Sequence, residues 1–83
     1  MKIIARVLIE DTDTSPITFK LFELDENLFY AKPIDRDRPE LHFGIVNGHI
    51  QLIASSTTKP IPAFIEKKFI RNINAYMQGV KAL

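Results

Sequence analysis

The hydrophobic residues of this chain change their spacing once, and that change limits the folds open to it. From Met1 to about Ala54, apolar and polar residues alternate with a period of two, which is typical of β-strands. From about Pro62 to Val80, apolar residues recur every three or four positions, which is typical of an amphipathic helix. The order of these patterns predicts a single α+β domain over residues 1–83, with an antiparallel sheet followed by one helix.

Turn-forming residues divide the period-two region into five segments. Short polar residues and prolines cluster at residues 11–16, 25–27 and 33–40, where such side chains bond to their own backbone. Pro33 has no amide hydrogen to donate, so we expect it to end the third strand or to confine that strand to an edge of the sheet. The predicted strands of this five-stranded antiparallel meander are residues 1–10, 17–24, 28–32, 41–46 and 49–54.

The last two strands are predicted by two independent signals. Asn47-Gly48 tolerates the positive φ angles of a type I′ hairpin turn. With this pair as the loop, one face holds the apolar pairs Ile45–Ile50, Phe43–Leu52 and Leu41–Ala54. The other face holds Val46–His49, Gly44–Gln51 and His42–Ile53. The turn and the apolar pattern therefore predict the same register.

The helix is predicted over residues 62–78. Proline disfavours helix in the residue before it, so Pro62 is expected to be the first helical residue. Gly79 suits the left-handed position after a helix, with Val80 folding back on the last turn. The apolar stripe consists of Ile65, Phe69, Ile73, Tyr76, Met77 and Val80. A helix of this length spans about 25 Å, close to the length of one strand, so it covers one face of the sheet only.

The uncovered face is the first candidate site. It is predicted to carry five apolar residues among the polar residues Lys2, Arg6, Lys20, His42, His49 and Gln51. These apolar residues are Ile4, Leu8, Phe22, Val46 and Ile53. An apolar cluster of this kind marks a contact surface, and a homodimer is the partner that we favour. The alternative is that the five residues are scattered and have no partner.

The charges suggest a second candidate site. Residues 1–40 hold nine carboxylates against six cations, whereas residues 41–83 hold one carboxylate against five cations. Lys67, Lys68 and Arg71 stand in the first half of the helix, where the macrodipole disfavours positive charge. They form a candidate anion contact, joined by Lys59 and the hydroxyls of residues 55–58. The alternative is a charged helix face that keeps the domain soluble.

Other chemistry finds little support in the sequence. The chain has no Cys, which excludes thiolate chemistry, and no nucleophile or phosphate-binding motif, so we expect no enzyme and no cofactor. His42 and His49 are predicted about 14 Å apart, too far to share a metal. Asp11 and Asp13 are expected near Asp35 and Asp37, but Arg36 and Arg38 would neutralise such a cluster. We therefore predict no metal site.

These observations leave two function classes. The first is a non-catalytic interaction domain that self-associates. The second is a single-stranded nucleic-acid binder, since a meander with one helix is similar in layout to the single-strand-binding folds of the transcriptional coactivator and Whirly type, without a shared motif. A membrane contact ranks last because the sheet needs the helix's apolar stripe. With no apolar run of membrane-spanning length and no signal peptide, we expect a cytoplasmic protein.

Overall fold

In the computed structural model, five strands and one helix form a two-layer α+β fold. The structure describes residues 2–11, 14–35 and 38–81. The strands are β1 (Lys2–Asp11), β2 (Thr14–Asp25), β3 (Leu28–Pro33), β4 (Leu41–Val46) and β5 (His49–Ser55), and the helix is α1 (Ala63–Lys81). The predicted fold class is confirmed.

The five strands form one antiparallel sheet in the order β1-β2-β3-β4-β5. Each strand pairs with its neighbours in sequence, as expected for a meander. β3 runs one residue further than predicted, to Pro33, and lies at the centre of the sheet and not at an edge. β1 and β2 run further than predicted, to Asp11 and from Thr14, and their pairing shifts register near that end. These two strands therefore extend well beyond the short strand β3.

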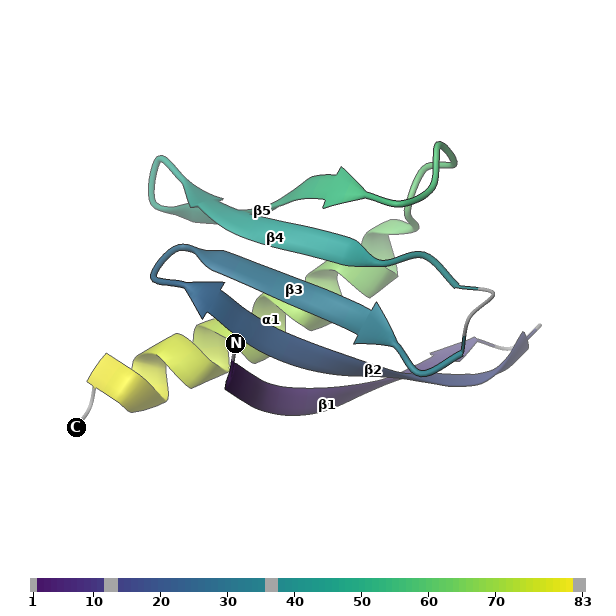
Figure 1. Cartoon of the computed structure of the whole chain (residues 1–83), viewed down its shortest axis with the longest axis horizontal. Coiled ribbons are helices and arrows are strands. Elements are labelled where there is room, and N and C mark those ends of the chain that lie inside the picture. Colours follow the sequence, from purple (N-terminus) through teal and green to yellow (C-terminus); the bar gives the residue numbers. More distant parts are fainter. Residues whose placement is uncertain (1, 12–13, 36–37, 82–83) are drawn as a thin grey trace.

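The helix covers one face of the sheet, which we call the inner face, and leaves the outer face open. Figure 1 shows α1 crossing behind the sheet on a diagonal, from the end of β5 toward the start of β1. Phe69 and Ile73 of the helix are fully buried against the inner-face side chains. The buried inner-face residues are Val7, Ile9, Phe19, Leu21, Phe29, Ala31, Leu41 and Phe43.

A bulge in β1 corrects the prediction for the first strand. Ile3 pairs with Phe22 and Ala5 pairs with Leu21, so Ile4 is an extra residue in the ladder. The extra residue reverses the alternation before it. Ile4 therefore packs against the core, and its predicted place on the uncovered face is wrong. Ile3 takes that place on the outer face.

The same bulge moves Lys2 to the inner face. Lys2 pairs with Glu23, whose carboxylate accepts a hydrogen bond of 3.0 Å from the hydroxyl of Tyr76 in the helix. The Lys2 Nζ atom lies 5.8 Å from the centroid of the Tyr76 ring, which is within range of a cation–π contact. The prediction that Lys2 lies on the uncovered face is therefore wrong as well.

The β4–β5 hairpin has the predicted turn and most of the predicted register. Asn47 and Gly48 have φ angles of 53° and 81°, as a type I′ turn requires. The pairs from Val46–His49 to Phe43–Leu52 are confirmed. Beyond them a bulge intervenes, so His42 pairs with Ala54 and Leu41 with Ser55. The predicted pairs Leu41–Ala54 and His42–Ile53 are wrong because Ile53 is the extra residue.

The helix begins and ends later than predicted. The Pro62 carbonyl accepts the amides of Ile65 and Glu66, so Pro62 caps the helix and Ala63 is its first residue. At the other end, α1 continues through Gly79 to Lys81. Gly79 is not among the glycines with positive φ, so the predicted left-handed cap at Gly79 is wrong.

We predict that Gly79→Ala stabilises the domain by up to about 1 kcal/mol. A helical glycine costs about 0.5–1 kcal/mol relative to alanine, and no heavy atom lies within 4 Å of a Cβ built at Gly79. The matched substitution Gly48→Ala should destabilise the domain, because Gly48 has a φ of 81°. Urea denaturation of both variants measures these changes. Destabilisation by Gly79→Ala would contradict the helical assignment.

Candidate functional site

The outer face is the larger of two candidate surfaces. Ile3, Leu8, Val46 and Ile53 are between 39% and 50% exposed there. Leu8, Val46 and Ile53 are residues that the sequence predicts for this face, and Phe22 joins them half-buried. The Ile53 side chain lies over Gly44, since a Cβ at Gly44 would be 3.1 Å from Ile53 Cδ1. The structure thus brings four of the five predicted residues to one face and replaces Ile4 with Ile3.

A row of side chains, here called the aromatic row, crosses the outer face from edge to edge. Cα pairing runs from Ile3 to Phe22, Tyr30, His42 and Ala54, one residue from each strand. The Phe22 and Tyr30 rings stack with their centroids 6.0 Å apart, and the Tyr30 and His42 rings stack at 4.8 Å. Tyr30 therefore has a ring against each of its faces, and the row presents ring edges to its surroundings.

The Tyr30 hydroxyl connects this row to the segment before β4. It donates a hydrogen bond of 2.5 Å to Oε1 of Glu40. The Glu40 backbone is bound in turn to Ser56, whose amide donates to the Glu40 carbonyl and whose hydroxyl accepts the Glu40 amide. Burial, followed by this hydrogen bond and the negative charge of Glu40, raises the pKa of Tyr30 to about 12.

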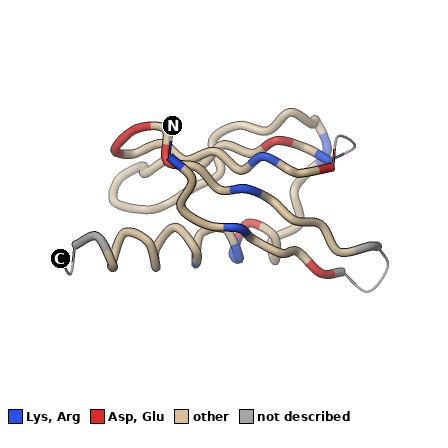
Figure 2. Tube along the Cα trace, turned by 60° about the horizontal axis from the view of Figure 1, so that its bottom comes forward, with Lys and Arg blue, Asp and Glu red and all other residues tan. Residues whose placement is uncertain are grey.

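Beside the aromatic row lies a second row of like charges, here called the cationic row. Arg6 pairs with Lys20, and Lys20 pairs with Lys32. The next row, Val7–Phe19–Pro33, is buried under the helix, so alternation places the three cations on the outer face. Figure 2 shows Lys and Arg along the strands of the sheet, whereas Asp and Glu lie nearer to the turns.

The helix cations of the predicted anion contact do not line the same pocket as Lys59, which was predicted to join them. Lys67, Lys68 and Arg71 are exposed on α1. Lys59 instead lines a pocket with Arg38, and none of the three helix cations lines it. The hydroxyls predicted to assist them serve the connector itself: Ser55 Oγ accepts the Thr57 amide, and Thr57 Oγ1 accepts the Lys59 amide.

The remaining candidates are placed separately. His42 belongs to the aromatic row, whereas His49 is exposed opposite Val46. Asp13 and Asp37 of the acidic loops lie outside the described residues. Among the residues that the structure does describe, no group of three or more His, Cys, Asp or Glu side chains is placed to hold a metal ion.

The comparisons with known proteins add no further assignment. Searches of protein-family models, curated proteins and solved structures find no match for this chain. Within the described part of the chain, no helical segment combines the length and the apolar character needed to cross a membrane.

We did not predict from the sequence that Tyr30 and His42 lie in a row with Phe22, or that Lys32 lies beside Lys20. Their alignment depends on the β2–β3 and β3–β4 registers, which hydrophobic alternation does not fix on a mixed face. A signal was present nevertheless. Counting outward from the turn at residues 25–27 places Phe22 opposite Tyr30, which is the observed pair.

We predict that Tyr30 titrates about two pH units above an ordinary tyrosine. In the Tyr76→Phe variant, Tyr30 is the single remaining tyrosine, so tyrosinate absorbance should rise with a midpoint near pH 12 rather than 10. Adding Glu40→Gln should lower that midpoint only in part, because burial is the larger cause. A midpoint near 10 in Tyr76→Phe would contradict the structure.

The sign of the accompanying stability change follows from the raised pKa. A proton bound more tightly in the folded state stabilises the fold below pH 10, and this contribution is lost between pH 10 and 12. Tyr30→Phe should therefore lose less stability over that interval than the parent protein does.

Proposed function

We propose that this domain is a non-catalytic interaction module that associates with a second copy of itself through the outer face. The observation that carries the proposal is the aromatic row, with the exposed residues Ile3, Leu8, Val46 and Ile53 on the same face. The helix occupies the opposite face, and no described segment of the chain covers this one. Apolar surface gathered on one side of a small domain is typical of a contact surface.

The shape of the outer face favours a sheet as its partner. The rings of Phe22, Tyr30 and His42 stand edge-on, so together they form a low ridge across the strands. A second sheet can pack on such a surface by interdigitating its own side chains, as in β-sandwiches. A second copy presents the same ridge and the same apolar residues.

The charges of the outer face select an orientation for that second copy. The cationic row lies on one side of the aromatic row, and the exposed acidic turn residues Asp25 and Glu26 lie on the other. A two-fold axis parallel to the aromatic row exchanges these two sides. Each acidic turn then approaches the partner's cations, and the two cationic rows avoid each other.

The size of the outer face limits the affinity. Four strand spacings of about 4.8 Å and six residues of about 3.3 Å give a footprint of roughly 400 Å². Standard stable interfaces bury about 800 Å² on each partner. We therefore expect a dimer with a dissociation constant of about 10–1,000 µM that weakens as salt screens the charge pairs.

Size-exclusion chromatography with light scattering, over a series of loading concentrations, tests the dimer. The parent protein should shift from monomer to dimer as the concentration rises. Val46→Glu should remain a monomer, because it places a carboxylate in the apolar contact. Phe64→Glu is the matched control, since Phe64 is 47% exposed on the helix side, and it should dimerise like the parent. A monomer at every concentration, or loss of the dimer in Phe64→Glu alone, would refute the proposal.

A second candidate function is binding of single-stranded nucleic acid through the cationic row. Arg6, Lys20 and Lys32 stand on adjacent strands, so three charges lie across about 10 Å and can contact successive phosphates. The stacking of the aromatic row is the reason that we rank nucleic-acid binding below self-association. Tyr30 has Phe22 on one side and His42 on the other, so a base finds no free ring face at the centre of the row.

This candidate predicts that binding of a labelled single-stranded oligonucleotide falls steeply with salt. Neutralising the cationic row with Arg6→Gln, Lys20→Gln and Lys32→Gln should abolish the binding. Neutralising Arg71, Lys67 and Lys68 also removes one arginine and two lysine charges, but from the helix, and should leave oligonucleotide binding unchanged. Absence of binding at about 50 mM salt excludes the second candidate.

A further inference from the structure

A pocket of about 550 Å³ opens on the helix side of the sheet, at the corner where α1 begins. Its size lies within the range of small-molecule sites, about 300–1,000 Å³. The pocket arises from the layout of the elements. The helix starts beside β5 and runs toward the start of β1, so the far ends of β1 and β2 extend past it. Ile9, Ile17 and Phe19 at those ends form one wall of the pocket.

The connector between β5 and α1 supplies the opposite wall. Pro60, Ile61 and Pro62 line the pocket, followed by Phe64 and Ile65 of the first helical turn. Phe64 remains 47% exposed, although it is a large aromatic side chain. A ligand against Phe64 would bury apolar surface there, and each Å² so removed from water contributes about 25 cal/mol.

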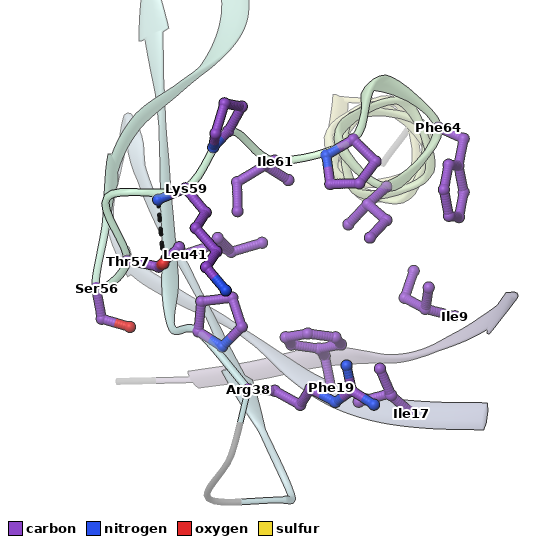
Figure 3. Close-up of a pocket in the computed structure, with 14 residues that line it drawn as sticks. Ile9, Ile17, Phe19, Arg38, Leu41, Ser56, Thr57, Lys59, Ile61 and Phe64 are labelled. Carbon is purple, nitrogen blue, oxygen red and sulfur yellow. Dashed lines mark hydrogen bonds between the residues drawn. The ribbon is translucent and has the colours of Figure 1, made fainter. Parts of the chain in front are cut away.

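The charged side chains of the pocket are all positive. Arg38 and Lys59 are the ionisable residues among the described residues that line it. Neither forms an ion pair with a described residue. Figure 3 shows Lys59 extending from the connector and Arg38 lying beside Phe19 and Ile17, whereas Phe64 and Ile9 lie on the side of α1. The pocket therefore combines two cations with an apolar wall.

The hydroxyls beside the cations can also bind an anion. Ser56 Oγ accepts the Glu40 amide, and Thr57 Oγ1 accepts the Lys59 amide. Each hydroxyl uses an oxygen lone pair in these bonds and keeps its own hydrogen to donate. The same bonds hold the Ser56–Lys59 segment in place, so the backbone fixes the positions of the Ser56 and Thr57 hydroxyls.

We propose that this pocket binds a small amphipathic carboxylate, with its head group at Arg38 and Lys59 and its apolar body against Phe64. The guanidinium of Arg38 offers two parallel donors that match the two oxygens of a carboxylate. A neutral apolar molecule would leave both cations unpaired, and a cationic one would be repelled. This site is separate from the outer face, so its failure or success does not depend on the self-association proposed above.

Decanoate is a suitable probe, and nuclear magnetic resonance titration of the full chain measures its binding. We expect a dissociation constant of about 0.1–1 mM and shifts centred on Ile9, Phe64 and Lys59. Decan-1-ol, with the same chain and no charge, should bind about tenfold more weakly, and decylammonium should bind more weakly still.

Matched variants test the head-group contacts. Arg38→Gln with Lys59→Gln should weaken decanoate binding about tenfold. Lys68→Gln with Arg71→Gln removes the same two charge types from the exposed helix and should leave binding unchanged. The proposal is overturned if decanoate causes no shifts, if decan-1-ol or decylammonium binds as tightly, if both variant pairs behave alike, or if the shifts lie elsewhere.

Discussion

The fold depends on aromatic contacts between its two layers, centred on Phe69. Phe69 of α1 is fully buried between Phe19 of β2 and Phe43 of β4, with ring centroids 5.0 Å and 5.4 Å apart. Truncating a buried phenylalanine of this kind to alanine costs about 3–5 kcal/mol, a large share of the stability of a small domain. Because the described residues form a single helix and these contacts fix it to the inner face, the outer face stays open.

Two single-residue bulges decide which side chains that open face carries. The extra residue Ile4 turns Ile3 outward and Lys2 inward, and the extra residue Ile53 places two side chains opposite His42. The outer face consequently gains apolar area at its edges. Gly44 contributes as well, because the absence of a side chain there lets Ile53 lie flat on the sheet.

The period of the apolar residues predicted the strands and the helix, and the residue pair Asn47-Gly48 predicted the hairpin turn, because each rests on a local preference. Bulges rest on packing instead. Ile3 and Ile4 are identical side chains, so alternation could not tell which of them faces the helix. Gly79 was misread for a related reason: its preference for a cap is weak, and the helix continues past it. The aromatic row and the corner pocket combine residues distant in sequence, such as Arg38 and Lys59, and no local pattern joins them.

The central claim is that the open side of the sheet is the surface through which the domain makes contact. Methyl resonances recorded over a dilution series test it most directly, since the two faces carry different isoleucines. The account predicts that the signals of Ile3 and Ile53 move as the concentration rises while those of Ile9 and Ile73 stay fixed. Signals that never move, or movement confined to the helix side, would contradict it.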